Sequence, residues 1–120
     1  MKKHILYPLL LLSTAVFAGE ADVVDVKTRC HGECTFYVTV KHQDSGWDHF
    51  ANRWEVLTPD GQILATRTLL HPHVNEQPFM RSLSHIKIPA GINNVTVRAH
   101  DSVHGYGGRT MDIKVNAKSN

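Results

Sequence analysis

Nine histidines stand in this chain of 120 residues, and their placement points to a chemical site. Six of them fall in or beside three polar segments, residues 42–50, 70–78 and 100–108. These six are His42, His49, His71, His73, His100 and His104. The same segments contain four carboxylates: Asp44, Asp48, Glu76 and Asp101. Imidazole nitrogens and carboxylate oxygens bind transition-metal ions in proteins, so the pattern predicts a metal site if the fold gathers the three segments.

The motif His71-Pro72-His73 is the sharpest local signal. Pro72 biases His71 towards an extended conformation, in which residues i and i+2 point to the same side. Both imidazoles could then reach one ion. The alternative is a pair of solvated loop histidines.

The other two segments would supply the rest of the coordination shell. The predicted metal ligands are His71, His73, His104, His49 and Asp101. Because this set contains no thiolate, it suits Cu²⁺, Zn²⁺ or Fe²⁺, of which copper binds most tightly in open competition.

The same segments also carry side chains that could contact a protein or a glycan. Trp47 and Tyr106 are large amphipathic groups of the kind that anchor binding surfaces, and Tyr106 lies among three glycines. Further ligand-binding candidates are Asp48, Glu76 and His100. Two simpler interpretations stay open: residues 44–46 form an ordinary turn with Trp47 folded onto the core edge, and His100 is an exposed strand residue.

The two cysteines, Cys30 and Cys34, flank a tripeptide between two predicted strands, residues 23–29 and 35–41. Opposed residues of an antiparallel hairpin lie within disulfide distance, and an oxidising compartment favours the bond. We therefore predict a Cys30–Cys34 disulfide. Metal binding by both thiolates and His31 is the alternative.

The first 18 residues have the form of a signal peptide. Lys2 and Lys3 precede a short apolar stretch, and Val16-Phe17-Ala18 offers small residues for a signal peptidase. We expect cleavage after Ala18 and a protein that is periplasmic or secreted; an uncleaved anchor is the alternative. The apolar stretch is shorter than the roughly 20 residues of a membrane span.

The rest of the chain, residues 19–120, is expected to form a single domain. Without Lys2 and Lys3 its basic and acidic residues balance, so no basic stripe argues for nucleic acid. No later segment is apolar enough to predict a membrane span.

Short alternating runs at intervals of about ten residues predict an all-β fold. Phe36, Val38 and Val40 alternate with polar residues, and Val24 and Val26 are expected to share one face. The full count is seven strands, which we interpret as an antiparallel immunoglobulin-like or fibronectin III-like sandwich with Trp54 in its core. A phase change predicts a bulge near Ser84. If the strands alternate up and down, the three histidine-bearing segments emerge at one end.

One loop resembles part of a known family. Asp101-Ser102-Val103-His104-Gly105 is similar to the Cys-Asn-x-His-Gly loop of desulfoferrodoxin-type superoxide reductases, and His71-Pro72 looks like the start of their His-Pro-Met loop. The resemblance implies an immunoglobulin-like scaffold with iron bound by histidines, and it carries over His104 and His71. Asp101 stands in place of the family's axial cysteine.

Three hypotheses follow from the sequence. The first is an exported metal-binding module for copper, zinc or iron. The second is an immunoglobulin-like recognition module that binds a protein or glycan through the same loops. The third is a small metalloenzyme resembling superoxide reductase, which we favour least.

Overall fold

The computed structural model describes residues 19–116, which form seven strands and no helix. The strands are β1 (Asp22–His31), β2 (Glu33–Lys41), β3 (Ala51–Leu57), β4 (Ile63–Thr68), β5 (Phe79–Ile86), β6 (Asn94–Asp101) and β7 (Met111–Lys114). The signal peptide expected over residues 1–18 lies outside the described residues, as do residues 117–120.

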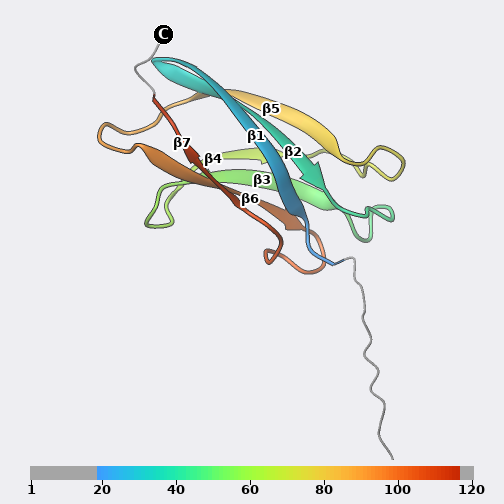
Figure 1. The fold of residues 1–120 in the computed structure, drawn as a ribbon. Coiled ribbons are helices and arrows are strands. Elements are labelled where there is room, and N and C mark those ends of the chain that lie inside the picture. The colour runs from blue at the N-terminus through green and yellow to red at the C-terminus, as the bar shows by residue number, and fades with distance from the viewer. Residues whose placement is uncertain (1–18, 117–120) are drawn as a thin grey trace, which may run out of the picture.

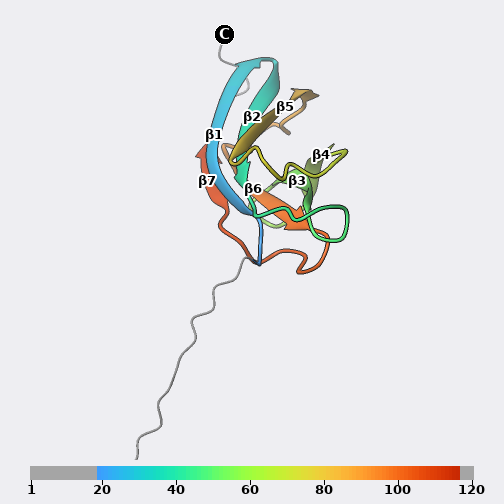
Figure 2. The same ribbon diagram turned by 90° about the vertical axis from the view of Figure 1, so that its right-hand side faces the viewer.

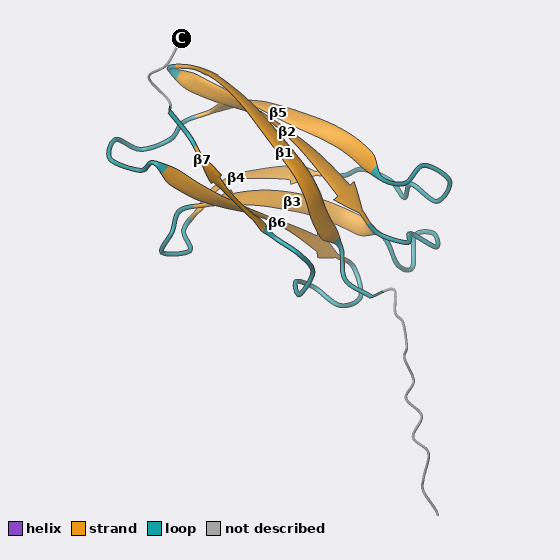
Figure 3. Ribbon diagram, viewed as in Figure 1, coloured by secondary structure: helices purple, strands orange, loops and turns teal. Residues whose placement is uncertain are grey.

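Two antiparallel sheets pack face to face (Figures 1 and 3). One has the strand order β1-β2-β5 and the other β4-β3-β6-β7. Figure 2 looks onto the end of the sandwich and shows the two layers side by side. The predicted all-β architecture with seven strands is confirmed.

The core lies between the sheets and follows the alternation of the sequence. Phe36, Val38 and Val40 are fully buried on β2, and Val95, Val97 and Ala99 are buried on β6. Trp54 on β3 is fully buried in the same cluster, as predicted. Burial of each such side chain contributes about 1.5–3 kcal/mol, so this interior holds the two sheets together.

Register shifts interrupt the regular pairing in both sheets, and two of them lie in the sheet β1-β2-β5. The register of β1 against β2 shifts between Val23 and Asp25, so Val23 is fully buried and Val24 is only half-buried. The expectation that Val24 shares the inner face with Val26 is therefore wrong. The second irregularity falls on β5 between Leu83 and Ile86, which confirms the bulge predicted near Ser84.

The connections alternate between the two ends of the sandwich. The loops β2–β3, β4–β5 and β6–β7 leave one end, where the chain also enters at residue 19 (Figures 1 and 2). The hairpin β1–β2 and the turns β3–β4 and β5–β6 lie at the other end. The three histidine-bearing segments are thus brought to one end, as the topology predicted.

The predicted disulfide joins Cys30 of β1 to Cys34 of β2. These residues are directly opposed in the hairpin, with Cα atoms 4.0 Å apart. Since both sulfurs are in this bond, they are not thiolate ligands.

Candidate metal centre

Three potential ligand atoms converge where the core opens onto the loop end. They are Nε2 of His42, Nε2 of His49 and a carboxylate oxygen of Asp101. The two Nε2 atoms lie 3.2 Å apart, and Oδ2 of Asp101 is 2.8 Å from His49 Nε2 and 3.9 Å from His42 Nε2. His42 follows β2, His49 belongs to the β2–β3 loop, and Asp101 ends β6. Both sheets therefore contribute to the cluster.

His42 is held in one orientation by a buried carboxylate. Its Nδ1 lies 2.5 Å from Oδ1 of Asp44, and both side chains are fully buried. A carboxylate oxygen accepts, so Nδ1 carries a proton, and in the neutral ring Nε2 then presents its lone pair to the cluster. A carboxylate behind the imidazole is the arrangement that fixes metal-binding histidines in proteins.

Asp44 also joins two of the loops. Its Oδ1 accepts a hydrogen bond from the Ala51 N–H at 2.9 Å, and its Oδ2 accepts one from the His73 N–H at 2.7 Å. The β2–β3 and β4–β5 loops thus meet on one carboxylate beneath His42.

Asp101 is a fully buried acid with one carboxylate oxygen that accepts no hydrogen bond from the described residues. Its Oδ2 accepts hydrogen bonds from the backbone N–H groups of Val103 and His104 and lies next to the His49 ring. Its Oδ1 is buried and has no hydrogen-bond partner among the described residues. Burial alone would raise the pKa of Asp101, but these N–H groups and His49 outweigh it and lower that pKa below its usual value. The side chain is an anion in the interior, and it needs a cation nearby.

Local loop structure positions His49. Ser45 N–H donates to the His49 carbonyl and His49 N–H donates to the Gly46 carbonyl, which closes a small turn. Gly46 has φ +146°, a conformation that L side chains rarely adopt. Phe50 and Ser102 then exchange two hydrogen bonds between the β2–β3 and β6–β7 loops. This pairing brings His49 against Asp101.

Two more groups stand at the rim of the cluster. The Nδ1 atom of His104 is 3.3 Å from Asp101 Oδ2, and its ring centroid is 4.9 Å from that of His49. The carbonyl oxygen of Gly19 is 3.2 Å from His42 Nε2.

Of the five predicted ligands, the structure brings His49 and Asp101 into the cluster and His104 beside it. His71 and His73 form a separate pair with ring centroids 4.6 Å apart. His73 is buried against Phe79, and Arg81 donates to its Nε2 at 2.8 Å. Burial, with the charge of Arg81, lowers the pKa of His73, so its ring is neutral and the Nε2 lone pair is already used. Of the two positions matched to superoxide reductases, only His104 lies at the cluster.

The predicted ligand-binding residues divide into two groups. Trp47, Asp48 and Glu76 are exposed; the residue Trp47 is 67% exposed, and its ring packs edge-on against Phe50. His100 and Tyr106 instead meet on the outer face of the four-stranded sheet with ring centroids 4.8 Å apart.

Tyr106 belongs to a charged cluster around Glu55. Its hydroxyl donates to Glu55 at 3.0 Å, its ring lies 3.8 Å below the Arg98 guanidinium, and Arg53 donates to its oxygen at 2.8 Å. Burial, followed by the nearby Arg53 charge, lowers the pKa of His100. Most polar atoms of His100 and Tyr106 are thus already engaged with neighbouring side chains of the domain.

The sequence analysis did not place His42 and Asp44 among the ligands, although a signal for both is present. On β2 the inward positions Phe36, Val38 and Val40 are followed at the same spacing by His42 and Asp44. On β6, Val95, Val97 and Ala99 lead in the same way to Asp101. A polar residue in phase with a buried strand face must point into the molecule, which distinguishes these residues from solvated loop histidines.

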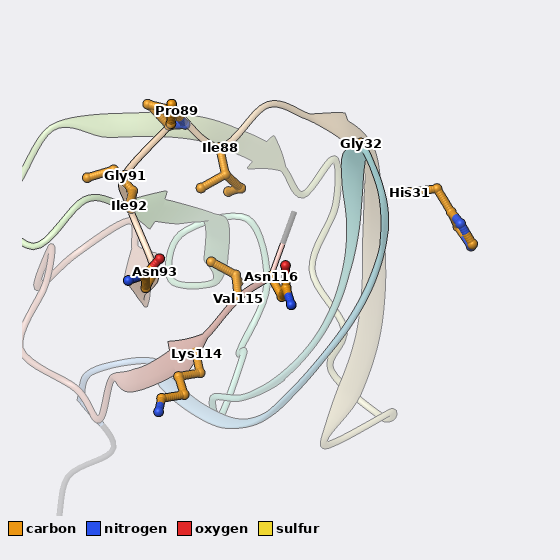
Figure 4. Close-up of a pocket in the computed structure, with 11 residues that line it drawn as sticks. His31, Gly32, Ile88, Pro89, Gly91, Ile92, Asn93, Lys114, Val115 and Asn116 are labelled. Carbon is orange, nitrogen blue, oxygen red and sulfur yellow. The ribbon is translucent and has the colours of Figure 1, made fainter. Parts of the chain in front are cut away.

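A wide hollow lies at the opposite end of the sandwich, between the hairpin β1–β2, the β5–β6 turn and the end of β7. Ile88, Ile92 and Val115 line it, and the His31 ring points away from the other lining side chains (Figure 4). It gathers no set of ligands comparable to the His42–His49–Asp101 cluster.

Among the residues that the structure describes, no helix is long and apolar enough to cross a membrane. A protein of Halomicrobium mukohataei with the description "Putative lipoprotein" is 46% identical over 96 residues, which cover 78% of this chain and 47% of that relative. The chain therefore spans about half the length of the curated relative it matches. No family model and no solved structure matches the chain.

Proposed function

We propose that this protein is an exported transition-metal-binding protein whose site is formed by His42, His49 and Asp101. The convergence of two Nε2 atoms and one carboxylate oxygen at the mouth of the core carries the proposal.

The spacing of these atoms suits a metal ion. Ligand bonds of about 2.0–2.1 Å in a tetrahedral shell place neighbouring ligand atoms about 3.3 Å apart. The three separations are 3.2, 2.8 and 3.9 Å, which scatter around that value. Asp44 supplies the supporting carboxylate behind His42, and the unpartnered Oδ1 of Asp101 offers a second oxygen.

The donor chemistry favours Cu²⁺ or Zn²⁺. Two imidazoles and a carboxylate are borderline donors that both ions accept, and copper is bound more tightly where both compete. The thiolate of superoxide reductases has no counterpart at Asp101, and both cysteines are in the disulfide. We therefore propose binding of the ion, for storage, delivery or resistance, as the role of the site.

Three observations support export. The basic start, apolar stretch and Val16-Phe17-Ala18 of the sequence have the form of a cleavable leader. The relative from Halomicrobium mukohataei carries the description "Putative lipoprotein". A disulfide-bonded domain is consistent with an oxidising compartment.

We also propose that the sandwich is of the immunoglobulin or fibronectin III type. Strands β1, β2 and β5 form one sheet and β3, β6 and β7 share the other, as in those folds. The fourth strand pairs with β3, whereas in constant-type immunoglobulin domains it pairs with the fifth strand.

Elemental analysis of the exported protein, purified without affinity tag or chelator, tests the metal site. We expect close to one equivalent of copper or zinc in the wild type and in a His71→Ala variant. A folded His49→Ala variant should contain far less. Equal metal in both variants, or no metal and no uptake by the wild type on reconstitution, would reject the site.

A recognition module is the second candidate, because the loop end exposes apolar side chains. These are Trp47, Leu70, Val74 and Val103, each at least half exposed. Exposed apolar side chains on loops are typical of surfaces that bind a partner or a sugar. Screening the metal-free protein on a glycan array tests this candidate: a hit that Trp47→Ala abolishes would support it, and a screen without Trp47-dependent binding would count against a glycan ligand.

A further inference from the structure

Gly19 lies at the metal centre although it is far from the other ligands in sequence. Its carbonyl oxygen is 3.2 Å from Nε2 of His42, and the residue is buried. A methyl group added to its α-carbon would meet the His104 ring at 3.5 Å, so Gly19 also lies beside that ring. The residue thus sits between two histidines of the site.

The segment that carries Gly19 is fixed to the domain. Val23 N–H donates to the Arg109 carbonyl at 2.8 Å, and Arg109 N–H donates to Asp22 Oδ1 at 2.7 Å. The approach is close at Gly108, where a β-carbon would lie 1.9 Å from the Ala21 carbonyl oxygen. The three-glycine loop therefore lets the segment before β1 run against the β6–β7 loop.

The contact between Gly19 and His42 lacks a donor in the neutral ring. In that ring Nδ1 carries the proton and donates a hydrogen bond to Asp44, so Nε2 and the Gly19 carbonyl both present lone pairs to the same space. A cation between them satisfies both. The α-nitrogen of Gly19 is attached to the same α-carbon as this carbonyl group, so one ion could bind both atoms as a chelate.

Processing decides what that nitrogen is. In the precursor it belongs to the amide that follows Ala18, and an amide nitrogen does not offer a lone pair to a metal ion. Cleavage after Ala18, where Val16-Phe17-Ala18 places it, converts the same atom into an α-amino group.

We propose that signal cleavage after Ala18 completes the metal site, with the new α-amino group and the carbonyl oxygen of Gly19 joining His42, His49 and Asp101. This inference rests on the proposed function. It makes high-affinity binding of Cu²⁺ or Zn²⁺ a property of the processed protein, so that the ion is bound after export.

The test compares two proteins that differ by one residue at the start. One begins at Gly19 and the other retains Ala18, so that only the first has an amine on Gly19. Zn²⁺ affinity is measured for both by competition with a chromophoric chelator, after mass spectrometry has established the start of the exported protein. A His71→Ala version of the processed protein is the control, because it keeps the Gly19 amine and changes an exposed loop histidine outside the cluster.

We expect the exported protein to begin at Gly19 and the form retaining Ala18 to bind Zn²⁺ at least tenfold more weakly, with the His71→Ala control close to wild type. Equal affinities of the two forms, with His49→Ala still deficient, would overturn the inference and leave the proposed function intact. A different start of the exported protein would also overturn it. If none of the proteins binds Zn²⁺, both the function and the inference fail.

Chemical protection supplies a second readout. An acetylating reagent at neutral pH modifies accessible amines, and exposed Lys27 and Lys41 serve as internal references. With Zn²⁺ bound, acetylation of the Gly19 amine should slow several-fold while both lysines react as before. Unchanged reaction of the Gly19 amine in the loaded protein would show that the amine is not a ligand.

Discussion

At the scale of single residues, the candidate site forms where the inward-facing positions of two strands change from apolar to polar residues. The inner face of β2 continues into His42 and Asp44, and that of β6 ends at Asp101. Three polar groups are thereby placed at the edge of the core, where burial strengthens their interactions with a cation. The exposed His71 has no such support, although its motif with His73 is the more conspicuous one in the sequence.

Asp44 is the residue-scale test of this arrangement, because it touches the site only through His42. Replacing it by Asn removes the charge behind Nδ1 and turns an amide towards a backbone N–H of Ala51 or His73. We expect metal affinity to fall about 10–100-fold and the free energy of unfolding by about 1–3 kcal/mol. Isothermal titration and urea unfolding measure the two effects.

Asp48→Asn is the matched control, since Asp48 is an exposed aspartate of the same loop. It should retain wild-type affinity and stability. Equal losses in the two variants would mean that the general negative charge of the loop matters and the support of His42 does not.

The ionisation of Glu55 predicts how the stability of the domain depends on pH. Burial alone would raise its pKa, but hydrogen bonds from Arg98, Arg53 and Tyr106 outweigh burial and lower the pKa below its usual value of 4.5. A lowered folded-state pKa means that the ionised form stabilises the fold. This contribution is complete above about pH 4.5 and is lost as the pH falls through the folded-state pKa.

Glu55→Gln should therefore destabilise the domain by about 1–3 kcal/mol at neutral pH, because charged hydrogen bonds are lost. The difference from wild type should shrink as the pH falls below 4.5, the usual pKa of the side chain. Urea unfolding of both proteins between neutral and acidic pH measures this difference. A gap that stays constant over the acidic range would contradict the argument.

At the scale of elements, the β6–β7 loop positions the segment before β1. A β-carbon at Gly108 would lie 1.9 Å from the Ala21 carbonyl oxygen, and both sides of this contact are backbone. Gly108→Ala must therefore displace residues 19–21 or the loop. We expect a loss of about 1–3 kcal/mol in stability and weaker Zn²⁺ binding by the processed protein. Chemical unfolding and chelator competition test this, and wild-type values for both would show that the close approach is not needed.

The β1–β2 hairpin is the element that should not affect metal binding. Its disulfide closes a very short loop at the end opposite the cluster. Cys30→Ser/Cys34→Ser should lower the free energy of unfolding by on the order of 2 kcal/mol in the chain-entropy model. Metal stoichiometry, measured by elemental analysis, should not change. A folded double variant that no longer binds metal would show that the hairpin is needed for metal binding, contrary to this prediction.

At the scale of the molecule, the sequence was sufficient for the architecture and insufficient for the site. Alternation and turn residues predicted seven strands and placed three loops at one end, because strand periodicity reflects which face is buried. The side chains that meet there were predicted only in part, since their contacts depend on the loop conformations: His49 and Asp101 were expected as ligands, and His42 was not. The hydrogen bonds of Asp44 with the backbone of Ala51 and His73, and the contact of Gly19 with His42, link residues that are 7 to 29 positions apart. The inward phase of His42, Asp44 and Asp101 was readable from the alternation of their strands.

A metal ion bound across both sheets should stabilise the whole fold, and this is the last prediction. His42 and Asp101 extend the inner faces of β2 and β6, so an ion between them links the two layers. Free metal at 100 times Kd adds about 2.7 kcal/mol if the unfolded chain does not bind it. For a domain of this size that corresponds to a rise in Tm of roughly 10–20 °C.

Calorimetry of the processed protein with and without Zn²⁺ measures this rise, and EDTA should reverse it. His49→Ala should show little of it, whereas His71→Ala should show nearly all, since His71 is an exposed loop residue outside the cluster. Any metal binding by the histidines of the unfolded chain would make the observed rise smaller than this figure. Equal rises in the two variants would place the ion elsewhere on the surface. A rise confined to proteins with an intact His49 would instead locate the ion between the sheets, at the ends of β2 and β6.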